Sequence, residues 1–433
     1  MYSCVYYEAK RISIFKKASN KGDFILFIKS IFDIIQIVLF ITGCYYFAVA
    51  LFSLTVFEKK PTSSKLHSFA LLVAAHNEES VVGELVKSLK SLDYPEDLFE
   101  VIVIADNCTD STAQIAEENG ATVWTRFDET NRGKGYAMEF AFNKLFSLEK
   151  NFEYICVFDA DNLVKNDFLS RMNSKINEGY RAVQGYLDSK NPSDNWLTFS
   201  YSMWYWINNR LSQLARGNLN LGCRLGGTGF AVESQLIKEY GWGATCLAED
   251  TEFTLKIALN NIKVGWAHDA TVYDEKPTHF NTSINQRTRW MQGLSAVAVS
   301  YVKPLIKKTI CEKSSTAFHM LMNFWGDTLH PLTVIFFWAV YLMSFILKPD
   351  FLIYQLLCDF WKTPLNMVLL SVFVWGNLLI TTAGLYNDQK LDKNIMKNSP
   401  GFFIYIITWI PIGIMGFFKR NKKEWFHTPH SNK

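Results

Sequence analysis

The stretch Tyr154-Ile-Cys-Val-Phe-Asp-Ala-Asp161 decides how the rest of the chain is arranged. Its first five residues are apolar and rich in β-branched and aromatic types, which predicts a buried strand. Two carboxylates, Asp159 and Asp161, then stand at the carboxyl end of that strand. Ligands bind at the carboxyl ends of the strands in open α/β sheets. The pair therefore favours a hard divalent cation, Mg²⁺ or Mn²⁺, with a solvated turn as the alternative.

Further apolar segments precede this strand, and each is followed by polar or acidic residues. Helical segments are expected between them, over Val81–Leu92, up to Ala116, and from Lys134 onward. The alternation of strands and helices, at about 30 residues per unit, predicts an α/β domain with a mostly parallel, helix-covered sheet. The expected strands are Phe69–Ala75, Phe99–Ala105 and Ala121–Trp124.

The segments that follow these strands suit a phosphorylated ligand. Glu78 follows the first strand, and Asp106 and Asp110 follow the second. Lys134 stands between two glycines at the start of a predicted helix, and a helix N-terminus with a lysine suits a phosphate group. Taken singly, the aspartates could be helix N-caps and Lys134 a surface turn. Because the strand ends of one sheet lie along one edge, we expect these residues to converge.

Composition separates a soluble middle from two apolar ends. The chain has 433 residues, of which 49% are hydrophobic, and a formal net charge of only +3, which gives no general case for nucleic-acid binding. A run of about 20 apolar residues is long enough to span a bilayer. The last apolar segment contains Pro411 and Gly413, so it is either spanning or interfacial.

The expected organisation follows from this pattern. It comprises a polar basic N-terminus (1–23), an interfacial plus transmembrane helix (24–57, with Ile34–Phe57 as the span), a catalytic domain (66–293), amphipathic interface helices (294–330), transmembrane or interfacial helices (331–418, with candidate spans Pro331–Leu347, Leu365–Leu385 and Phe402–Phe418) and a basic tail (419–433).

Six motifs over residues 66–293 resemble glycosyltransferase family 2 in their order and spacing. The last motif is typical of its membrane-integrated processive synthases, which make cellulose, hyaluronan, chitin or poly-N-acetylglucosamine. The resemblance implies a GT-A-type nucleotide-sugar-binding domain. The motifs are Ala75-His-Asn-Glu-Glu79, Ile104-Ala-Asp-Asn-Cys-Thr-Asp110, Arg132-Gly-Lys-Gly-Tyr-Ala137, Phe158-Asp-Ala-Asp161, Ala248-Glu-Asp250 and Gln286-Arg-Thr-Arg-Trp290.

The resemblance implies a set of donor-binding residues. Asp159 and Asp161 would hold the metal, and Asp106 would contact the uridine. Many relatives carry two adjacent acids after the second strand, whereas this chain has Ala105 before Asp106. A diphosphate leaving group also needs cationic partners, and the planar fork of arginine suits phosphate oxygens. The implied nucleotide-sugar-binding set is Ala75, Glu78, Asp106, Lys134, Asp159, Gln286, Arg287 and Arg289.

Catalytic and acceptor-binding roles are implied in the same way. Asp250 is expected to take the proton of the acceptor hydroxyl as general base, with Glu249 orienting it. Trp290 would offer an apolar face to the acceptor sugar, with a membrane-interface anchor as the alternative. Gly227 and Thr228 lie in a glycine-rich segment that either lets the backbone approach an acceptor sugar or is a plain loop.

The basic tail bears on topology. Trp425 and Thr428 resemble the Trp-x-x-Thr gating loop of some synthases, which closes over bound nucleotide on the cytosolic side. An even number of spans must then follow the catalytic domain, and we favour two spans plus one interfacial helix.

The resulting expectation is an inverting, processive β-glycosyltransferase of the plasma membrane with a cytosolic catalytic domain. It would transfer sugar from a UDP-sugar to a polysaccharide acceptor, with Mg²⁺ or Mn²⁺ as cofactor and the lipid bilayer as a further partner. One alternative is a non-processive transferase with a lipid acceptor. Another is a non-catalytic membrane protein that senses nucleotide sugars.

Overall fold

The computed structural model describes residues 21–57, 63–243, 246–325 and 364–421. The predicted span Pro331–Leu347 and the predicted gating residues Trp425 and Thr428 lie outside these ranges. The chain forms two compact units, one from Met1–Ala48 with His330–Leu379 and one from Val49–Leu329 with Ile380–Lys433.

The first unit contains most of two long helices, α2 (Lys21–Ala50) and α15 (Pro364–Asn387). α2 ends at Ala50, before the predicted Phe57, and a short 3₁₀ turn (Leu51–Ser53) follows. Gly376 of α15 lies against the ring of Phe47, where an added Cβ would come within 2.7 Å of the ring. Large apolar side chains of both helices are exposed, including Ile41, Trp375 and Leu379. Such surfaces suit a lipid environment.

The second unit is built on one sheet, whose eight described strands have the order β3-β2-β1-β4-β7-β6-β8-β5. The strands are β1 (Phe69–Ala75), β2 (Phe99–Asp106), β3 (Thr122–Arg126), β4 (Tyr154–Asp159), β5 (Leu163–Val164), β6 (Ala182–Ser189), β7 (Phe230–Glu233) and β8 (Val264–Asp274).

The sheet is mostly parallel, as predicted, with two antiparallel interruptions. β3, β2, β1 and β4 are mutually parallel, and so are β6 and β8. β7 is antiparallel to both β4 and β6, and β5 is antiparallel to β8. In register, Ala75 pairs with Ala105, and Ala74 pairs with both Ile104 and Asp159. The carboxyl ends of β1, β2 and β4 are therefore level.

Helices cover both faces of this sheet, because the central strands β1, β2 and β4 are apolar on both sides. The side chains of α3, α4 and α6 form one core with alternate strand residues, and α5, α7, α9 and α10 form the other. The helices are α3 (Val82–Lys90), α4 (Thr112–Glu118), α5 (Lys134–Phe146), α6 (Phe168–Ile176), α7 (Trp196–Ile207) with a π-helical continuation (Asn208–Leu214), α8 (Ala215–Asn218), α9 (Ser234–Tyr240), α10 (Glu249–Ala258), α11 (Phe280–Cys311), α12 (Ser315–Phe324), α16 (Lys393–Met396) and α17 (Pro400–Lys419).

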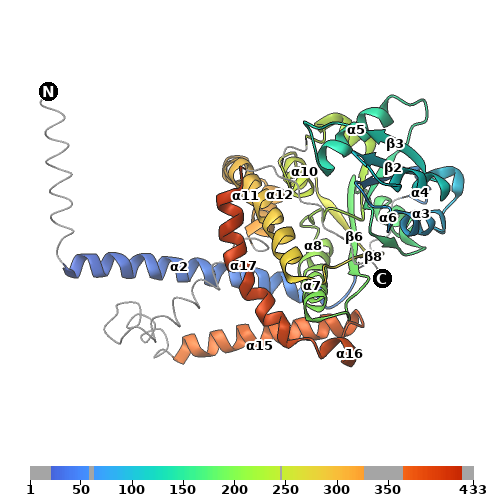
Figure 1. The fold of residues 1–433 in the computed structure, drawn as a ribbon. Helices are drawn as coiled ribbons and strands as arrows, with labels where there is room; N and C mark the ends of the chain where they lie inside the picture. The colour runs from blue at the N-terminus through green and yellow to red at the C-terminus, as the bar shows by residue number, and fades with distance from the viewer. Residues whose placement is uncertain (1–20, 58–62, 244–245, 326–363, 422–433) are drawn as a thin grey trace, which may run out of the picture. The chain divides into compact units, whose positions relative to one another are not determined.

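The segment after the predicted catalytic domain is continuous with it. Leu294–Ile310 forms the second half of α11, and α12 packs against it around the buried Leu305. α17 runs along α11 and also contacts α7 (Figure 1). In the described part of the chain, α17 alone is long and apolar enough to cross a membrane by length and composition.

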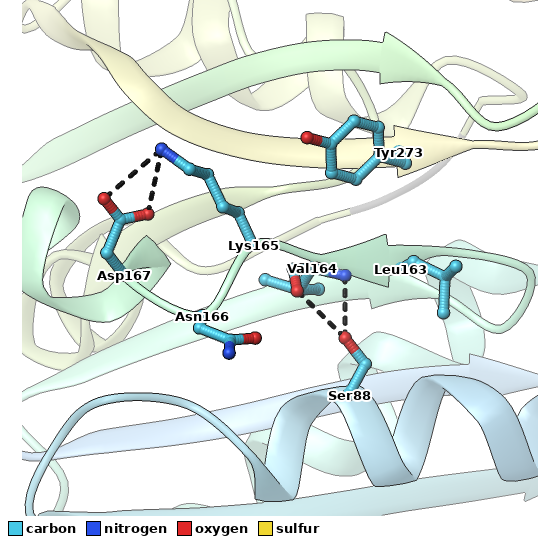
Figure 2. Close-up of a pocket in the computed structure, with 7 residues that line it drawn as sticks. All are labelled: Ser88, Leu163, Val164, Lys165, Asn166, Asp167 and Tyr273. Carbon is cyan, nitrogen blue, oxygen red and sulfur yellow. Dashed lines mark hydrogen bonds and ion pairs between the residues drawn. The ribbon is translucent and has the colours of Figure 1, made fainter.

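A cavity of about 540 Å³ lies at the β5 edge of the sheet, lined by residues of α3, β5, β8 and the segment after β5 (Figure 2). Ser88 of α3 closes this edge, because its hydroxyl accepts a hydrogen bond from the Val164 N–H (2.9 Å) and donates one to the Val164 carbonyl (3.0 Å). An edge strand whose backbone groups are paired in this way is protected from adding a further strand.

Candidate active site

Lys134 joins two of the predicted motifs. α5 begins at this lysine, directly after Gly133, whose φ of 115° suits a residue without a side chain. The Lys134 Nζ donates a hydrogen bond to the Gly227 carbonyl (2.7 Å) and forms an ion pair with the Asp159 carboxylate. The start of α5, the end of β4 and the glycine-rich segment therefore meet at one cation.

The loop that carries the two aspartates is held by Asn162 and Thr228. The Asp159 N–H donates to Asn162 Oδ1 (3.2 Å) and to Thr228 Oγ1 (3.1 Å). The Asn162 amide donates in turn to Asp161 Oδ1 (3.1 Å) and to Asp274 Oδ1 (3.4 Å), at the end of β8. These bonds hold the backbone of Asp159 and the carboxylate of Asp161 in place relative to the sheet.

The glycine-rich segment brings the predicted base into the same group. Gly227 has a φ of +83°, and a Cβ added there would lie 3.7 Å from Asp250 Oδ2. The fully buried Gln184 fixes this segment, because it accepts from the Gly226 N–H (2.8 Å) and donates to the Thr228 carbonyl (2.9 Å). Gly227 therefore stands between Lys134 and Asp250.

Glu249 and Asp250 begin α10. Burial raises the pKa of Glu249, and the negative charge of Asp250 raises it further. Burial also raises the pKa of Asp250, although the Thr251 N–H and the charges of Arg224 and Lys134 act against this rise. Burial alone would lower the pKa of Lys134, but the carboxylates of Asp159, Glu249 and Asp250 outweigh it and raise the pKa. The group is thus electrostatically coupled, and Lys134 is charged.

The Gln286–Trp290 segment lies in the first turns of α11, and three of its side chains, those of Gln286, Arg287 and Arg289, have a buried polar atom without a hydrogen-bond partner among the described residues. Gln286 Oε1 and Arg289 Nε are buried and make no hydrogen bond within the described residues. Gly293 packs against Ala248, where an added Cβ would lie 2.6 Å from the Ala248 nitrogen. The positive charge of Arg289 lowers the pKa of Glu249, against the effect of burial. Buried polar groups normally have partners, so these atoms suit a polar ligand.

Arg287 lies elsewhere than the predicted diphosphate contact requires. Its side chain is fully buried, and it donates to Thr408 Oγ1 (2.8 Å) of α17. Its guanidinium carbon lies 4.4 Å from the Tyr405 ring centre, 5.3 Å from that of Trp409 and 5.9 Å from that of Tyr201. The guanidinium is directed toward α17 rather than toward Lys134. We therefore remove Arg287 from the donor-binding set.

Trp290 is half-buried and lies beside the same aromatic residues. Its ring centre is 6.1 Å from that of Tyr201, in an edge-to-face arrangement. Tyr201 packs in turn against Tyr405 of α17 at 5.0 Å. Both predicted roles of Trp290, as a sugar platform and as an interface anchor, are compatible with this position.

The predicted uridine contacts lie at the ends of β1 and β2. The Glu78 N–H donates to Thr112 Oγ1 (2.7 Å). Asp106 Oδ1 accepts from Arg126 Nη1 (2.5 Å) within a buried ion pair. Burial raises the pKa of Asp106, with Arg126 acting in the opposite direction. Asp106 is therefore no N-cap.

Ala75 and Asp110 complete this side of the site. The Ala75 carbonyl accepts from the Cys108 thiol (3.4 Å). Asp110 Oδ1 accepts from the Thr112 N–H (3.0 Å), but Asp110 is not the N-cap of α4, because Ser111 occupies that position.

Asp159 and Asp161 are the predicted ligands of the divalent metal. Asp159 and Asp161 would supply two hard oxygen ligands from a strand end, and six-coordinate Mg²⁺ is commonly bound by one or two carboxylates plus substrate phosphates and water. Within the described residues no three His, Cys, Asp or Glu side chains form a ready ligand group. The donor set therefore fits a metal that is completed by a diphosphate.

Several residues at the site were missed by sequence reasoning. Arg126 donates a hydrogen bond to the Asn131 carbonyl (2.7 Å) as well as to Asp106. It therefore links Asp106, the predicted uridine contact, to the loop before Lys134. Lys276 is buried, pairs with Asp274 (2.6 Å) and lies 3.7 Å from the Tyr205 ring centre. None of these residues belongs to a spaced motif. Their strand-end positions were the available signal.

A family comparison agrees with this geometry. The description "Glycosyltransferase like family 2" matches residues 67–293, just over half of the chain. The chain belongs to glycosyltransferase family 2 and is a glycosyltransferase.

Curated relatives of different activities are about equally similar. The probable glycosyltransferase YdaM of Bacillus subtilis is 25% identical over 374 residues, which cover 84% of this chain and 85% of the relative. The β-monoglucosyldiacylglycerol synthase of Synechocystis is 25% identical over 379 residues (83% and 74%). The poly-β-1,6-N-acetyl-D-glucosamine synthase of Staphylococcus epidermidis is 25% identical over 362 residues (81% and 81%). The relatives thus divide between glycolipid and polysaccharide synthases.

A solved structure shows the same fold. The mannosyltransferase PcManGT from Pyrobaculum calidifontis, in complex with GDP-Man and Mn²⁺, covers 92% of this chain and 99% of its own, with a TM-score of 0.55 and 16% identity. The catalytic unit of this chain therefore has a GT-A-like α/β fold.

Proposed function

We propose that this protein is an inverting β-glycosyltransferase that moves a sugar from a UDP-sugar to the growing end of a polysaccharide. One observation carries the proposal: Lys134 contacts both Asp159 and Gly227, and Gly227 stands next to Asp250. A metal-binding acid, a cation for phosphate and a base are thereby gathered at the level ends of parallel strands. This arrangement is what transfer from a diphosphate-linked sugar requires.

The donor would bind along the strand ends. Ala75, Glu78 and Asp106 would receive the uridine, and Arg126 keeps the Asp106 carboxylate in place. Lys134, Gln286 and Arg289 would bind the diphosphate, whose oxygens give the buried Arg289 Nε–H an acceptor. Asp159 and Asp161 would hold Mg²⁺ or Mn²⁺, and the PcManGT complex contains Mn²⁺ in the same fold. The ion would supply positive charge to the departing diphosphate.

Asp250 would act as the general base, with Glu249 orienting it. The acceptor hydroxyl gives its proton to the Asp250 carboxylate while its oxygen forms a bond to the anomeric carbon. The bond from that carbon to the diphosphate oxygen breaks on the opposite face, and UDP leaves with the electron pair. Gly227 and Thr228 would border the acceptor hydroxyl, and Trp290 would support the acceptor sugar ring.

A lipid acceptor is the second candidate, and two observations support it. One of the relatives is named as a glucosyldiacylglycerol synthase. Apolar side chains of α17, including Phe403, Ile404 and Phe418, are exposed on the catalytic unit. The exposed apolar side chains of α17 would also attach a polysaccharide synthase to the membrane. Analysis of the product therefore decides between the two acceptors.

We further propose that the protein is integral to the plasma membrane with a cytosolic catalytic unit. The exposed apolar side chains of α2, α15 and α17 support contact with lipid. Because α17 packs along α11, it fits an interfacial helix after two spans. The gating role of Trp425 and Thr428 stays a prediction.

Product analysis tests this proposal. Purified full-length protein in lipid nanodiscs would be incubated with a panel of radiolabelled UDP-sugars and Mg²⁺ or Mn²⁺, with UDP release measured. The labelled product would then be divided by organic extraction and sized by gel filtration. Polymerisation predicts water-soluble, high-mass label, and a lipid acceptor predicts label in the organic phase. No UDP release from any donor, or release that Asp250→Asn leaves unchanged, would contradict the proposed reaction.

A further inference from the structure

A positive charge is enclosed in the interior, on the turns of α11 that carry Gln286, Arg289 and Trp290. Arg287 is fully buried on α11, and its guanidinium lies against the rings of Tyr405 and Trp409 from α17 and of Tyr201 from α7. We call these three rings the aromatic cage. Nη1 donates to Thr408 Oγ1 (2.8 Å) and to the Tyr405 carbonyl (3.4 Å), both on α17.

The cage holds this charge without a carboxylate from the described residues. The partners of the guanidinium there are ring faces, the Thr408 hydroxyl and backbone carbonyls, and Nη2 is buried without a hydrogen bond. A cation over an aromatic face is attracted by the ring's quadrupole, and this attraction is stronger when water is excluded. The contact depends on α17, because two of the three rings and both long-range hydrogen bonds come from that helix.

On its other side, the same short piece of α11 touches the residues that directly precede Glu249 and Asp250. Gly416 of α17 packs so closely on Met291 that a side chain there would overlap it, and Gln292 Nε2 donates to the Lys419 carbonyl (3.2 Å). Gly293 packs against Ala248, directly before Glu249 and Asp250. Residues 286–293 are therefore sandwiched between α17 and the start of α10.

A chain of ring contacts connects α17 to Trp290, the predicted acceptor-binding residue. Trp290 packs edge-to-face on Tyr201 (6.1 Å), and Tyr201 packs on Tyr405 (5.0 Å). A shift of α17 would thus move Tyr201 and Trp290 together. Arg289 and Gln286 occupy the same turns of α11 as Arg287 and would follow.

We propose that Arg287 is a positioning residue: it docks α17 onto α11 and thereby sets where Arg289 and Trp290 stand relative to Asp250. This inference rests on the proposed function, since it assigns Arg289 and Trp290 to that reaction. It makes α17 part of the catalytic apparatus, although α17 carries none of the predicted donor, acceptor or catalytic residues.

Three variants and one control test the inference in the full-length protein. Arg287→Met removes the charge and the hydrogen bonds, Arg287→Lys keeps the charge without the planar fork, and Thr408→Val removes one hydrogen bond at the α17 end. Lys307→Met, on an exposed part of α11, is the matched control. The measurements are kcat and KM for UDP release, the Kd of UDP by calorimetry, and amide hydrogen exchange over residues 400–419.

For Arg287→Met we expect kcat to fall by about 10- to 100-fold, as displacement of a catalytic group by about 1 Å can do. The Kd of UDP should rise by no more than about tenfold, because Arg289 and Gln286 are displaced while Lys134 and the metal-binding acids stay in place. Exchange over 400–419 should become faster. Arg287→Lys should recover part of kcat and of the protection, Thr408→Val should show a smaller loss of both, and Lys307→Met should match the wild type.

Two results would overturn the inference. Weaker UDP binding with unchanged exchange in Arg287→Met would return Arg287 to the diphosphate. Faster exchange with unchanged kcat per folded molecule would show that the aromatic cage stabilises the fold but does not position Arg289 and Trp290. If the wild type releases no UDP from any donor, the proposed function fails, and the exchange rates alone then decide whether Arg287 holds α17.

Discussion

Replacing Lys134 with methionine should weaken UDP binding strongly. The Lys134 side chain is 19% exposed and contacts the Asp159 carboxylate and the Gly227 carbonyl. The carboxylates of Glu249 and Asp250 also act on its charge. When a metal and diphosphate arrive, the ammonium group can exchange Asp159 for a phosphate oxygen. A hydrogen bond to a charged group contributes about 1.5–3 kcal/mol, which corresponds to about 10- to 100-fold in the Kd of UDP.

Calorimetric titration of UDP in the presence of Mn²⁺ measures this effect. Lys144→Met is the matched control, because Lys144 is exposed on the last turn of the same helix. Its Kd should stay within about twofold of the wild type. Unchanged UDP binding in Lys134→Met, or equal weakening in both variants, would refute the assignment of Lys134 to the phosphate.

Three further predictions concern other residues. Asp388→Asn should destabilise the catalytic unit by about 3–5 kcal/mol, because it breaks a buried ion pair with Arg210 (2.7 Å). Burial raises the pKa of Asp388, but His268, Arg210 and Lys390 outweigh burial and lower this pKa. The stabilisation by the ion pair should therefore be present above the ordinary aspartate pKa of 3.8 and be lost from the wild type below that pH. Thermal unfolding at several pH values would show this loss in the wild type and not in Asp388→Asn. Arg126→Met should raise the Kd of UDP by about tenfold, because Asp106 loses its charged partner, and calorimetry showing no change would contradict this. Asp161→Asn should weaken Mn²⁺ binding in the presence of UDP by at least about tenfold, measured by paramagnetic resonance titration, and an unaltered Mn²⁺ affinity would remove Asp161 as a ligand.

The parallel half of the fold could be predicted because its strands are buried on both sides. Phe69–Ala75 is apolar throughout and forms β1 with the predicted bounds, and β4 ends at Asp159 as expected. β7, β8 and the two-residue β5 were not predicted. Their position depends on pairing with strands far away in the chain, such as Val157 with Phe230, and local patterns do not contain that information.

Site residues could be predicted from the sequence where they stand in a short motif. Their surroundings could not be predicted where a helix from a distant part of the chain packs on them. Lys134 and Asp159 stand in short, spaced motifs, and the structure brings them together. Arg287 also stands in a motif, but α17 covers it more than 100 residues later in the chain, through Tyr405 and Thr408. No pattern near Arg287 indicates that cover, so the sequence could not show that this arginine points away from the donor.

Turnover of Asp250→Asn tests the central claim most directly. The claim is that Asp250, beside Gly227 and Lys134, takes the acceptor proton while the other residues hold the donor. General bases contribute about 10²- to 10⁴-fold to rate, so kcat for sugar transfer should fall by that factor. The Kd of UDP should stay within about twofold, because the amide keeps the size and shape of the carboxylate. Sugar transfer at a rate close to that of the wild type, by a variant that still binds UDP normally, would contradict the account.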